Sequence, residues 1–224
     1  MAEHVTSADF QERLQTRAES ANLAIPARLL PPLETYYRLL ARWNVRINLT
    51  ALELDPLSDA AIDRLFLEPL SAARFVPIPP RLVWFDVGSG GGSPALPLLL
   101  ALPTLQLTMI ESRARKGAFL REAVRTLELD ANVETRRFED VVLSEERQAG
   151  LVTARAVRVD GRFLDAAASL LCPGGILALF HAGGIDSDLL SRACLTAQAP
   201  IDLFAGGSHQ LSVLRYVPRG TQLG

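Results

Sequence analysis

The feature that most constrains the fold is the alternation, from Arg81 onwards, of short apolar runs with amphipathic segments of helical length. Five runs have the length of a β-strand: LVWFDV, LQLTMI, NVETRR, LVTARA and GILALF. Strands that are apolar throughout are buried on both faces, as in a parallel sheet covered by helices. We therefore expect an α/β fold with a mostly parallel sheet and helices on both faces.

The end of the chain has a different pattern. Two runs, IDLF and HQLSVLRYV, are separated by the turn-forming residues AGGS. Such a pair favours an antiparallel hairpin. We expect these two strands to close the sheet.

The first 80 residues have the periodicity of helices. Helices are expected near Ser7 to Ser20, Pro32 to Ile47 and Pro56 to Ala73. The segment VPIPP then excludes regular structure, because proline lacks a backbone donor. We predict an N-terminal helical extension over residues 1–80, packed on a core domain over residues 81–224.

Composition excludes several classes of protein. The longest apolar segment, Pro94 to Ile110, is interrupted by Pro97 and Pro103 and makes a poor membrane span, and the amino terminus lacks a secretory signal. We therefore expect a cytoplasmic protein. The two cysteines, Cys172 and Cys194, stand apart from each other and from any histidine cluster, so we expect buried thiols and no metal. A net charge of −2 argues against binding nucleic acid by bulk attraction.

The strand LVWFDV runs directly into the loop GSGGGSPALP, in which Pro94 is placed to start a helix. Gly88, Gly90 and Gly92 have no Cβ, so a ligand can approach the bare backbone at the carboxyl edge of the sheet. The dinucleotide fingerprint needs a glycine at position 93, where this chain has Ser93. A nicotinamide cofactor is therefore disfavoured.

Acidic residues follow the next two strands. Glu111 ends LQLTMI, where a carboxylate can accept hydrogen bonds from both hydroxyls of a ribose. Glu139 and Asp140 follow the third strand, where a side chain can meet an adenine ring; the alternative is that both are solvated loop acids. The spacing of Asp86 and the glycines, D-x-G-x-G-x-G, resembles the first motif of class I S-adenosylmethionine-dependent methyltransferases, in which the leading acid helps to hold the methionine end. The residues expected at the cofactor are Asp86, Gly88, Ser89, Gly90, Gly92, Glu111, Ser112, Glu139 and Asp140.

Four segments together resemble the bacterial small-subunit ribosomal RNA guanine-N7 methyltransferases, also called glucose-inhibited division protein B. They are WNVRINLT, DVGSGGGSPALPL, ESRARKGAFLRE and TARAV, and the first is the most family-specific. The resemblance spans nearly the whole chain. It implies a Rossmann-like class I fold and methyl transfer from S-adenosylmethionine to N7 of one guanine in 16S ribosomal RNA, free or within a small-subunit precursor.

The resemblance also implies an acceptor site. N7 of guanine carries a free lone pair, so no general base is needed and positioning should supply most of the acceleration. Arg155 corresponds to the arginine of the family's serine-arginine-alanine motif, and we expect it to be the catalytic residue, holding guanine O6 while N7 is left free. The alternative for Arg155 is a surface salt bridge. The absence of an Asn-Pro-Pro-Tyr or Asp-Pro-Pro-Tyr motif argues against methylation of an exocyclic amine.

Two places depart from the family pattern. Leu65 and Glu68 stand where the family usually has histidine and aspartate, so a polar helper is expected to be missing. Phe180 and His181 stand where the family commonly has a lysine, and His181 is expected to be a surface loop residue.

Contacts with RNA are expected from two helices. Arg38, Arg42 and Arg46 form one stripe, and the segment from Arg113 to Arg125 presents a second basic face; the alternative for both is a solvated helix face. The predicted RNA-binding residues are Arg42, Arg46, Asn48, Arg113, Lys116 and Arg121. We expect a monomer that binds 16S ribosomal RNA or the small-subunit precursor and no membrane.

Three other functions stay open at this point. A divergent relative would keep the cofactor pocket and modify another substrate, as the departures at Leu65, Phe180 and His181 suggest. A binding module would sense the cofactor without catalysis. Nicotinamide chemistry is the weakest alternative because of Ser93.

Overall fold

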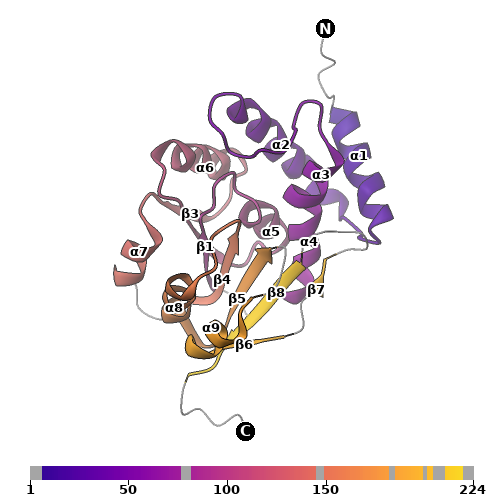
Figure 1. The fold of residues 1–224 in the computed structure, drawn as a ribbon. Helices are drawn as coiled ribbons and strands as arrows, with labels where there is room; N and C mark the ends of the chain where they lie inside the picture. Colours follow the sequence, from indigo (N-terminus) through magenta and orange to yellow (C-terminus); the bar gives the residue numbers. More distant parts are fainter. Residues whose placement is uncertain are drawn as a thin grey trace.

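The computed structural model describes residues 7–76, 82–144, 149–181, 185–198, 201–203 and 210–218. Its strands form one sheet in the order β3-β2-β1-β4-β5-β8-β6, with β7 paired to β8 (Figure 1). The strands β1 to β5 are parallel, and β8 runs antiparallel to β5, β6 and β7. The strand bounds are β1 Val83–Val87, β2 Gln106–Ile110, β3 Ala131–Glu134, β4 Ala149–Arg155, β5 Leu171–His181, β6 Leu195–Ala197, β7 Ile201–Asp202 and β8 Gln210–Tyr216. The expectation of a mostly parallel sheet is confirmed.

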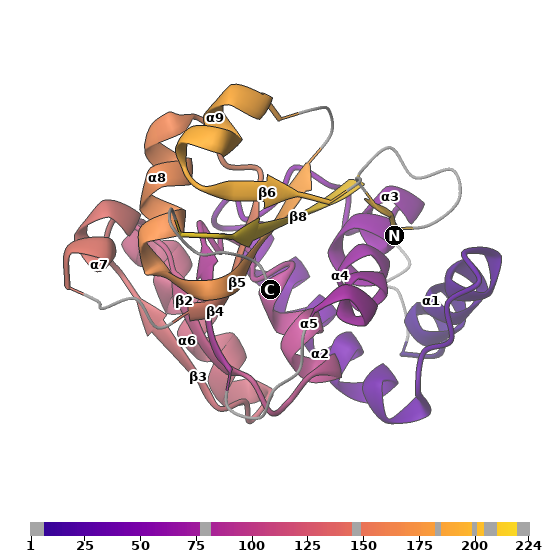
Figure 2. The same cartoon turned by 90° about the horizontal axis from the view of Figure 1, so that it is seen from below.

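The helices cover both faces of this sheet. Figure 2 shows α7 and α8 on one side and α2, α4 and α5 on the other. The core helices are α5 Ala95–Ala101, α6 Ala114–Thr126, α7 Phe138–Ser144, α8 Gly161–Leu170 and α9 Ser187–Arg192. The N-terminal part contains α1 Ser7–Ser20, η1 Ala27–Leu29, α2 Leu30–Asn44, α3 Asp59–Ile62, the π-helix η2 Asp63–Leu67, α4 Glu68–Ala72 and η3 Ala73–Phe75.

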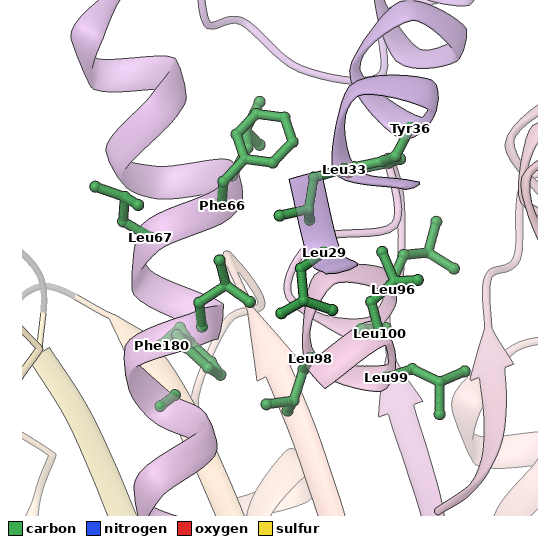
Figure 3. Close-up of a cluster of buried hydrophobic side chains, with 14 of the residues drawn as sticks. Leu29, Leu33, Tyr36, Phe66, Leu67, Leu96, Leu98, Leu99, Leu100 and Phe180 are labelled. Atoms are coloured by element: carbon green, nitrogen blue, oxygen red, sulfur yellow. The ribbon is translucent and has the colours of Figure 1, made fainter. Parts of the chain in front are cut away.

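The core follows from the alternation of side chains along the strands. In β1, Trp84 belongs to a hydrophobic cluster shared with the N-terminal helices, α5 and α6, whereas Phe85 and Val87 belong to a second cluster with α8. Figure 3 shows part of the first cluster, where Tyr36 and Phe66 lie near α5 and Phe180 of β5 lies beside the helix that carries Phe66. The N-terminal helices therefore share a core with the sheet.

The first expected helix, Ser7 to Ser20, agrees with α1, but the next two have different bounds. The helix expected over Pro32 to Ile47 is α2, which ends at Asn44 because Asn44 Oδ1 accepts hydrogen bonds from the backbone of Leu49 and Thr50 and turns the chain. Its prolines are tolerated because amides of the first turn have no acceptor in the helix.

The third helix, expected over Pro56 to Ala73, starts at Asp59, where the Ser58 side chain caps the Ala61 amide, and it is interrupted by the π-helix. The domain boundary expected at residue 80 lies outside the described residues, which resume at residue 82.

The C-terminal hairpin is confirmed, since Ile201 pairs with Leu211 and Asp202 with Gln210, while AGGS lies outside the described residues. The short strand β6 was not expected, because three residues show no periodicity. The expectation of buried thiols was wrong: Cys172 and Cys194 are both partly exposed. No helix in the described ranges is long and apolar enough to cross a bilayer.

Candidate cofactor and acceptor site

The glycine loop follows β1 and adopts a backbone that ordinary residues rarely adopt. Gly88, Gly90 and Gly92 have φ angles of 70°, 55° and 86°. The amide of Gly88 donates to the carbonyl of Ile110 at 2.9 Å, which joins the loop to the end of β2. A Cβ on Gly92 would lie 2.5 Å from Leu96 Cδ1, so this glycine lets α5 pack closely behind the loop.

Glu111 connects the ends of the neighbouring elements. One carboxylate oxygen accepts from the Gly90 amide at 3.0 Å and the other accepts from the Arg113 amide at 2.8 Å. The residue is buried. Because each carboxylate oxygen has a second lone pair, Glu111 holds the loop and keeps acceptor capacity for a ligand.

Two adjoining cavities lie over this loop. The first has a volume of about 420 Å³, and the second, of about 300 Å³, shares Gly88 and Glu111 with it. Together they make a groove at the carboxyl edge of the parallel strands, where open α/β sheets bind ligands.

The predicted cofactor residues are distributed unevenly over this groove. Gly88, Ser89, Gly90 and Glu111 line the first cavity, and the second is also lined by Ser112 and Glu139. Asp86, Gly92 and Asp140 line neither cavity; Asp86 is buried and Asp140 is exposed in the first turn of α7. The structure adds residues to the first cavity that were not predicted for the cofactor: Leu40, Leu49, Thr50, Ala51, Leu52, Arg64, Leu65, Gly91, Ser93, Lys116, Arg155 and Ala156.

Asp86 lies at the end of a buried hydrogen-bond chain. The indole of Trp84 donates to the hydroxyl of Thr153 at 2.8 Å, and this hydroxyl donates to Asp86 Oδ1 at 2.5 Å. The other carboxylate oxygen of Asp86 is buried without a partner among the described residues. Burial raises the pKa of Asp86 to about 6, against the hydrogen bond from Thr153, which lowers it.

The N-terminal helices supply one wall of the groove. The phenol of Tyr36 in α2 donates to the carbonyl of Gly91 at 2.7 Å. A Cβ on Gly91 would lie 3.3 Å from Leu40 and 3.4 Å from the carbonyl of Leu49, so glycine fits where these residues press on the loop. Asn44, within the segment WNVRINLT, shapes the adjoining turn through the backbone of Leu49 and Thr50.

Arg155 ends β4, and its Nε and Nη2 atoms are buried although the residue as a whole is partly exposed. Its Nη2 lies 2.9 Å from Glu68 Oε2, with side-chain exposures of 10% and 3%. Its Nη1 donates to the carbonyl of Arg64 and to the hydroxyl of Ser93, and its guanidinium carbon lies 4.7 Å from the ring centre of Phe180. Arg155 is therefore a buried partner of Glu68, and the surface salt bridge considered above was wrong.

The ionisation of this pair reflects its burial. Burial lowers the pKa of Arg155 to about 10 against the opposing charge of Glu68. Burial likewise raises the pKa of Glu68, which Arg155 and Arg64 oppose. Glu68 supplies a carboxylate to Arg155, whereas Leu65 contributes a buried apolar side chain, so the expectation that a polar helper is missing at that position stays a prediction.

A third cavity of about 150 Å³ lies beside the first and shares Arg64 and Ala156 with it. His181 and Phe180 form part of its lining. His181 is partly buried and its Nε2 lies 2.7 Å from the hydroxyl of Ser212, which differs from the surface loop position expected for it.

The predicted RNA-binding residues lie on two neighbouring helices or next to their ends. Arg42 of α2 pairs with Glu122 of α6 at 2.6 Å, which brings the two expected basic faces side by side. Arg46 and Asn48 are exposed beyond the end of α2, and Arg113 is exposed at the start of α6. Arg121 donates to the hydroxyl of Thr135, and Lys116 lines the first cavity. Arg38 is paired with Glu34 at 2.8 Å.

Comparison with known proteins gives one family. The family model described as rRNA small subunit methyltransferase G matches residues 30–192. Ribosomal RNA small subunit methyltransferase G of Stenotrophomonas maltophilia (strain K279a) is 38% identical over 178 residues, which are 79% of each chain. The protein of the same name from Acidiphilium cryptum (strain JF-5) is 37% identical over 164 residues, which are 72% of each chain.

Solved structures with the same fold are more distant in sequence. Precorrin-6y C5,15-methyltransferase from Geobacter metallireducens GS-15 superposes with a TM-score of 0.53 at 13% identity, over 67% of this chain and 87% of that one. A SAM dependent methyltransferase from Aquifex aeolicus gives a TM-score of 0.50 at 16% identity, over 70% and 93%. These likenesses identify the fold as that of methyltransferases. The match of the family model over most of the sequence and the identity of the relatives place this chain in the rRNA small subunit methyltransferase G family.

Proposed function

We propose that this protein transfers a methyl group from S-adenosylmethionine to N7 of a guanine in 16S ribosomal RNA. The observation that carries the proposal is that, in a chain of this family, the cofactor groove adjoins a separate third cavity. The groove over the glycine loop meets the third cavity at Arg64 and Ala156, so a donor and an acceptor base would lie next to each other.

The groove suits an adenosyl cofactor. Bare backbone from Gly88 to Gly91 would lie against the methionine end, Glu111 would accept from the ribose, and Ser112 with Glu139 would flank the adenine. Asp86 would orient the methionine end through Ser89 and the loop backbone, and its orphaned oxygen is consistent with a polar ligand or a water there. When bound, S-adenosylmethionine supplies an electrophilic methyl group on a sulfonium, which a free N7 lone pair accepts without prior deprotonation.

The third cavity suits a base that enters edge first. Its lining combines apolar side chains with the polar ends of Arg64 and His181. No general base is required for N7, so the residues here need only orient the guanine and exclude water. Arg155, which pairs with Glu68, packs against Phe180 in the lining of this cavity.

The RNA would lie across α2 and α6. Arg46, Asn48 and Arg113 are exposed. Asn48 and Arg113 adjoin, in the chain, Leu49 and Ser112, which line the groove. Arg42 and Arg121 carry further positive charge along α2 and α6. Lys116 lines the first cavity and would meet RNA only at its rim. The extension over residues 1–80 would then serve both as a wall of the cofactor groove and as an RNA-binding surface on the core domain.

The purified protein and labelled S-adenosylmethionine provide the direct test. Small ribosomal subunits and bare 16S RNA from a deletion strain should accept label at a single guanine, which mass spectrometry of RNA fragments identifies as N7-methylguanine. Label on a small metabolite alone, or an unchanged methylation pattern in the deletion strain, would contradict the proposal. We also propose that the protein is cytoplasmic and that it acts as a monomer. Light scattering on the purified protein tests the oligomeric state.

A further inference from the structure

The turn that carries Arg64 is widened relative to an α-helix. Residues Asp63–Leu67 form a π-helix, in which the amide of Glu68 donates to the carbonyl of Asp63. In an α-helix that amide would bond to the carbonyl of Arg64. Single π-turns are uncommon and occur often at functional sites.

The carbonyls in this turn are satisfied from the core domain. Arg155 Nη1 donates to the carbonyl of Arg64, and the hydroxyl of Ser93 donates to the carbonyl of Leu65 at 3.0 Å. The turn is therefore stabilised by side chains from β4 and from the glycine loop. Its geometry holds the Arg64 side chain at a defined place between the cofactor groove and the third cavity.

Arg64 and Arg155 are both partly exposed and both line the first cavity, but they differ in whether they also reach the third cavity. Arg155 is enclosed by Glu68 and Phe180 and lines the first cavity only. Arg64 is partly exposed and lines both cavities. Its Nε is buried and has no hydrogen-bond partner among the described residues. The same holds for Nε and Nη2 of Arg155, although that Nη2 faces Glu68 as an ion pair at 2.9 Å. Buried donors of this kind indicate a missing acceptor. Of the two arginines, Arg64 is the one that lines the third cavity, where an acceptor base would enter.

The local charge points in the same direction. Arg64 and Arg155 both act on the carboxylate of Glu68, and the positive charges of the two arginines oppose each other. Asp63 and Asp86 are also close enough to contribute. An electron-rich ligand edge beside Arg64 would offset the repulsion between the two guanidinium groups. Guanine presents such an edge at O6, next to N7.

We propose that Arg64 contacts O6 of the acceptor guanine and that Arg155 is a positioning residue, which holds the π-turn and through it Arg64. This inference rests on the proposed function and changes the role expected for Arg155. It requires that Arg64 act on the base and not on the cofactor or on a phosphate.

The test compares Arg64→Gln with the unaltered protein and with Arg192→Gln, which alters an exposed arginine on α9 away from the groove. Calorimetry with S-adenosylhomocysteine, melting temperature, and methyl transfer to small subunits from a deletion strain are measured for each. Arg64→Gln should keep its melting temperature and its affinity for S-adenosylhomocysteine within about threefold, and should lose about 10- to 100-fold in kcat/KM. Arg192→Gln should match the unaltered protein.

The salt dependence of RNA binding separates a base contact from a phosphate contact. Arg64→Gln should leave the slope of log affinity against log salt unchanged, whereas loss of a phosphate contact lowers it by about one. A lowered slope, a loss confined to cofactor affinity, or kcat/KM within threefold of the unaltered protein would each overturn the role of Arg64.

Arg64→Lys is the second variant, for the case in which Arg64→Gln does not fold. Arg155→Gln tests the role of Arg155. If Arg64→Gln does not fold, Arg64→Lys should show the same loss of turnover, because an ammonium lacks the planar fork of donors, and turnover within threefold would overturn the role. Arg155→Gln should lower both the melting temperature and turnover, and turnover lost without any loss of melting temperature would overturn its role as a positioning residue. Absence of methyl transfer by the unaltered protein would instead refute the proposed function itself.

Discussion

Asp86 and Tyr36 show how single residues shape the cofactor groove from beneath and from the side. Asp86 is buried, and one of its carboxylate oxygens is held by Thr153. Tyr36 is buried in α2 and holds the carbonyl of Gly91. Neither side chain needs to touch a ligand in order to set the position of the loop.

The pKa of Asp86 predicts an unusual pH dependence of stability. Its pKa rises from 3.8 in the unfolded chain to about 6 in the folded protein, so the folded state binds more protons than the unfolded state between these values. The contribution of Asp86 to the free energy of unfolding is therefore largest below the unfolded pKa and falls as the pH rises through the folded pKa. The total fall is about 3 kcal/mol.

Asp86→Asn isolates this contribution, because asparagine keeps an acceptor for Thr153 and does not titrate. Urea unfolding of both proteins from roughly pH 4 to pH 7 should show the variant gaining about 2.4 kcal/mol relative to the unaltered protein, since part of the total is already lost at pH 4. A stability difference that stays constant with pH would contradict the assignment.

Tyr36→Phe should weaken the cofactor groove. The carbonyl of Gly91 loses a donor at a partly buried position, so we expect a loss of about 1–3 kcal/mol in the free energy of unfolding. Because the loop also loses its tether, affinity for S-adenosylhomocysteine should fall about tenfold, as expected for ~1.4 kcal/mol.

Tyr37→Phe is the matched control for this variant. Tyr37 donates to the carbonyl of Leu54 at 2.7 Å and does not line the cofactor groove. It should cost a similar amount of stability and leave cofactor affinity unchanged. Equal cofactor affinities in the two variants would show that the Tyr36 hydrogen bond does not position the loop.

Among the elements, the π-helix η2 and the strand β4 depend on each other. Arg155 joins them through Glu68 and through the carbonyl of Arg64. Because both charges are buried, removing one leaves the other uncompensated. Removing both at once avoids that penalty.

A double-mutant cycle with Arg155→Met and Glu68→Leu tests this coupling. Each single variant should lose about 3–5 kcal/mol, and the double variant should lose clearly less than the sum. The exposed pair of Arg42 and Glu122 is the control, for which the coupling should be below about 1 kcal/mol. Additive losses at Arg155 and Glu68, measured by urea unfolding, would show that the two elements are independent.

At the scale of the whole molecule, the N-terminal helices and the sheet share one hydrophobic cluster. Phe10 and Leu33 of the helices belong to the same cluster as Leu151 and Val213 of the strands. The hydroxyl of Ser71 in α4 also donates to the carbonyl of Leu203 beyond β7, at 2.5 Å. We therefore expect the extension and the sheet to unfold in a single transition.

The two tryptophans allow this to be measured, since Trp43 lies in α2 and Trp84 in β1. Trp84→Phe leaves Trp43 as a probe of the extension, and Trp43→Phe leaves Trp84 as a probe of the sheet. In each variant, the urea midpoint from fluorescence should coincide with the midpoint from far-ultraviolet circular dichroism. Separate midpoints would indicate that the extension unfolds on its own.

Much of the fold and part of the site could be predicted without a structure. The buried strands, the glycine loop and the placement of Glu111 depend on residue types that are close together in the chain. The π-turn could not be predicted, because its periodicity over Asp63–Leu67 differs too little from that of an α-helix. The sequence also could not predict that Asp140 lies outside the groove, because this depends on the direction in which α7 leaves β3.

The sequence by itself determined the order of the elements, the cofactor loop and the resemblance to one family, since apolar periodicity and glycine spacing act over a few neighbouring residues. Only the tertiary structure decided that Glu68 would meet Arg155, that Tyr36 would hold Gly91, and that Arg64 would face two cavities. Each of these contacts joins segments far apart in the chain, and it forms only when the helices pack on the sheet at a particular distance and angle.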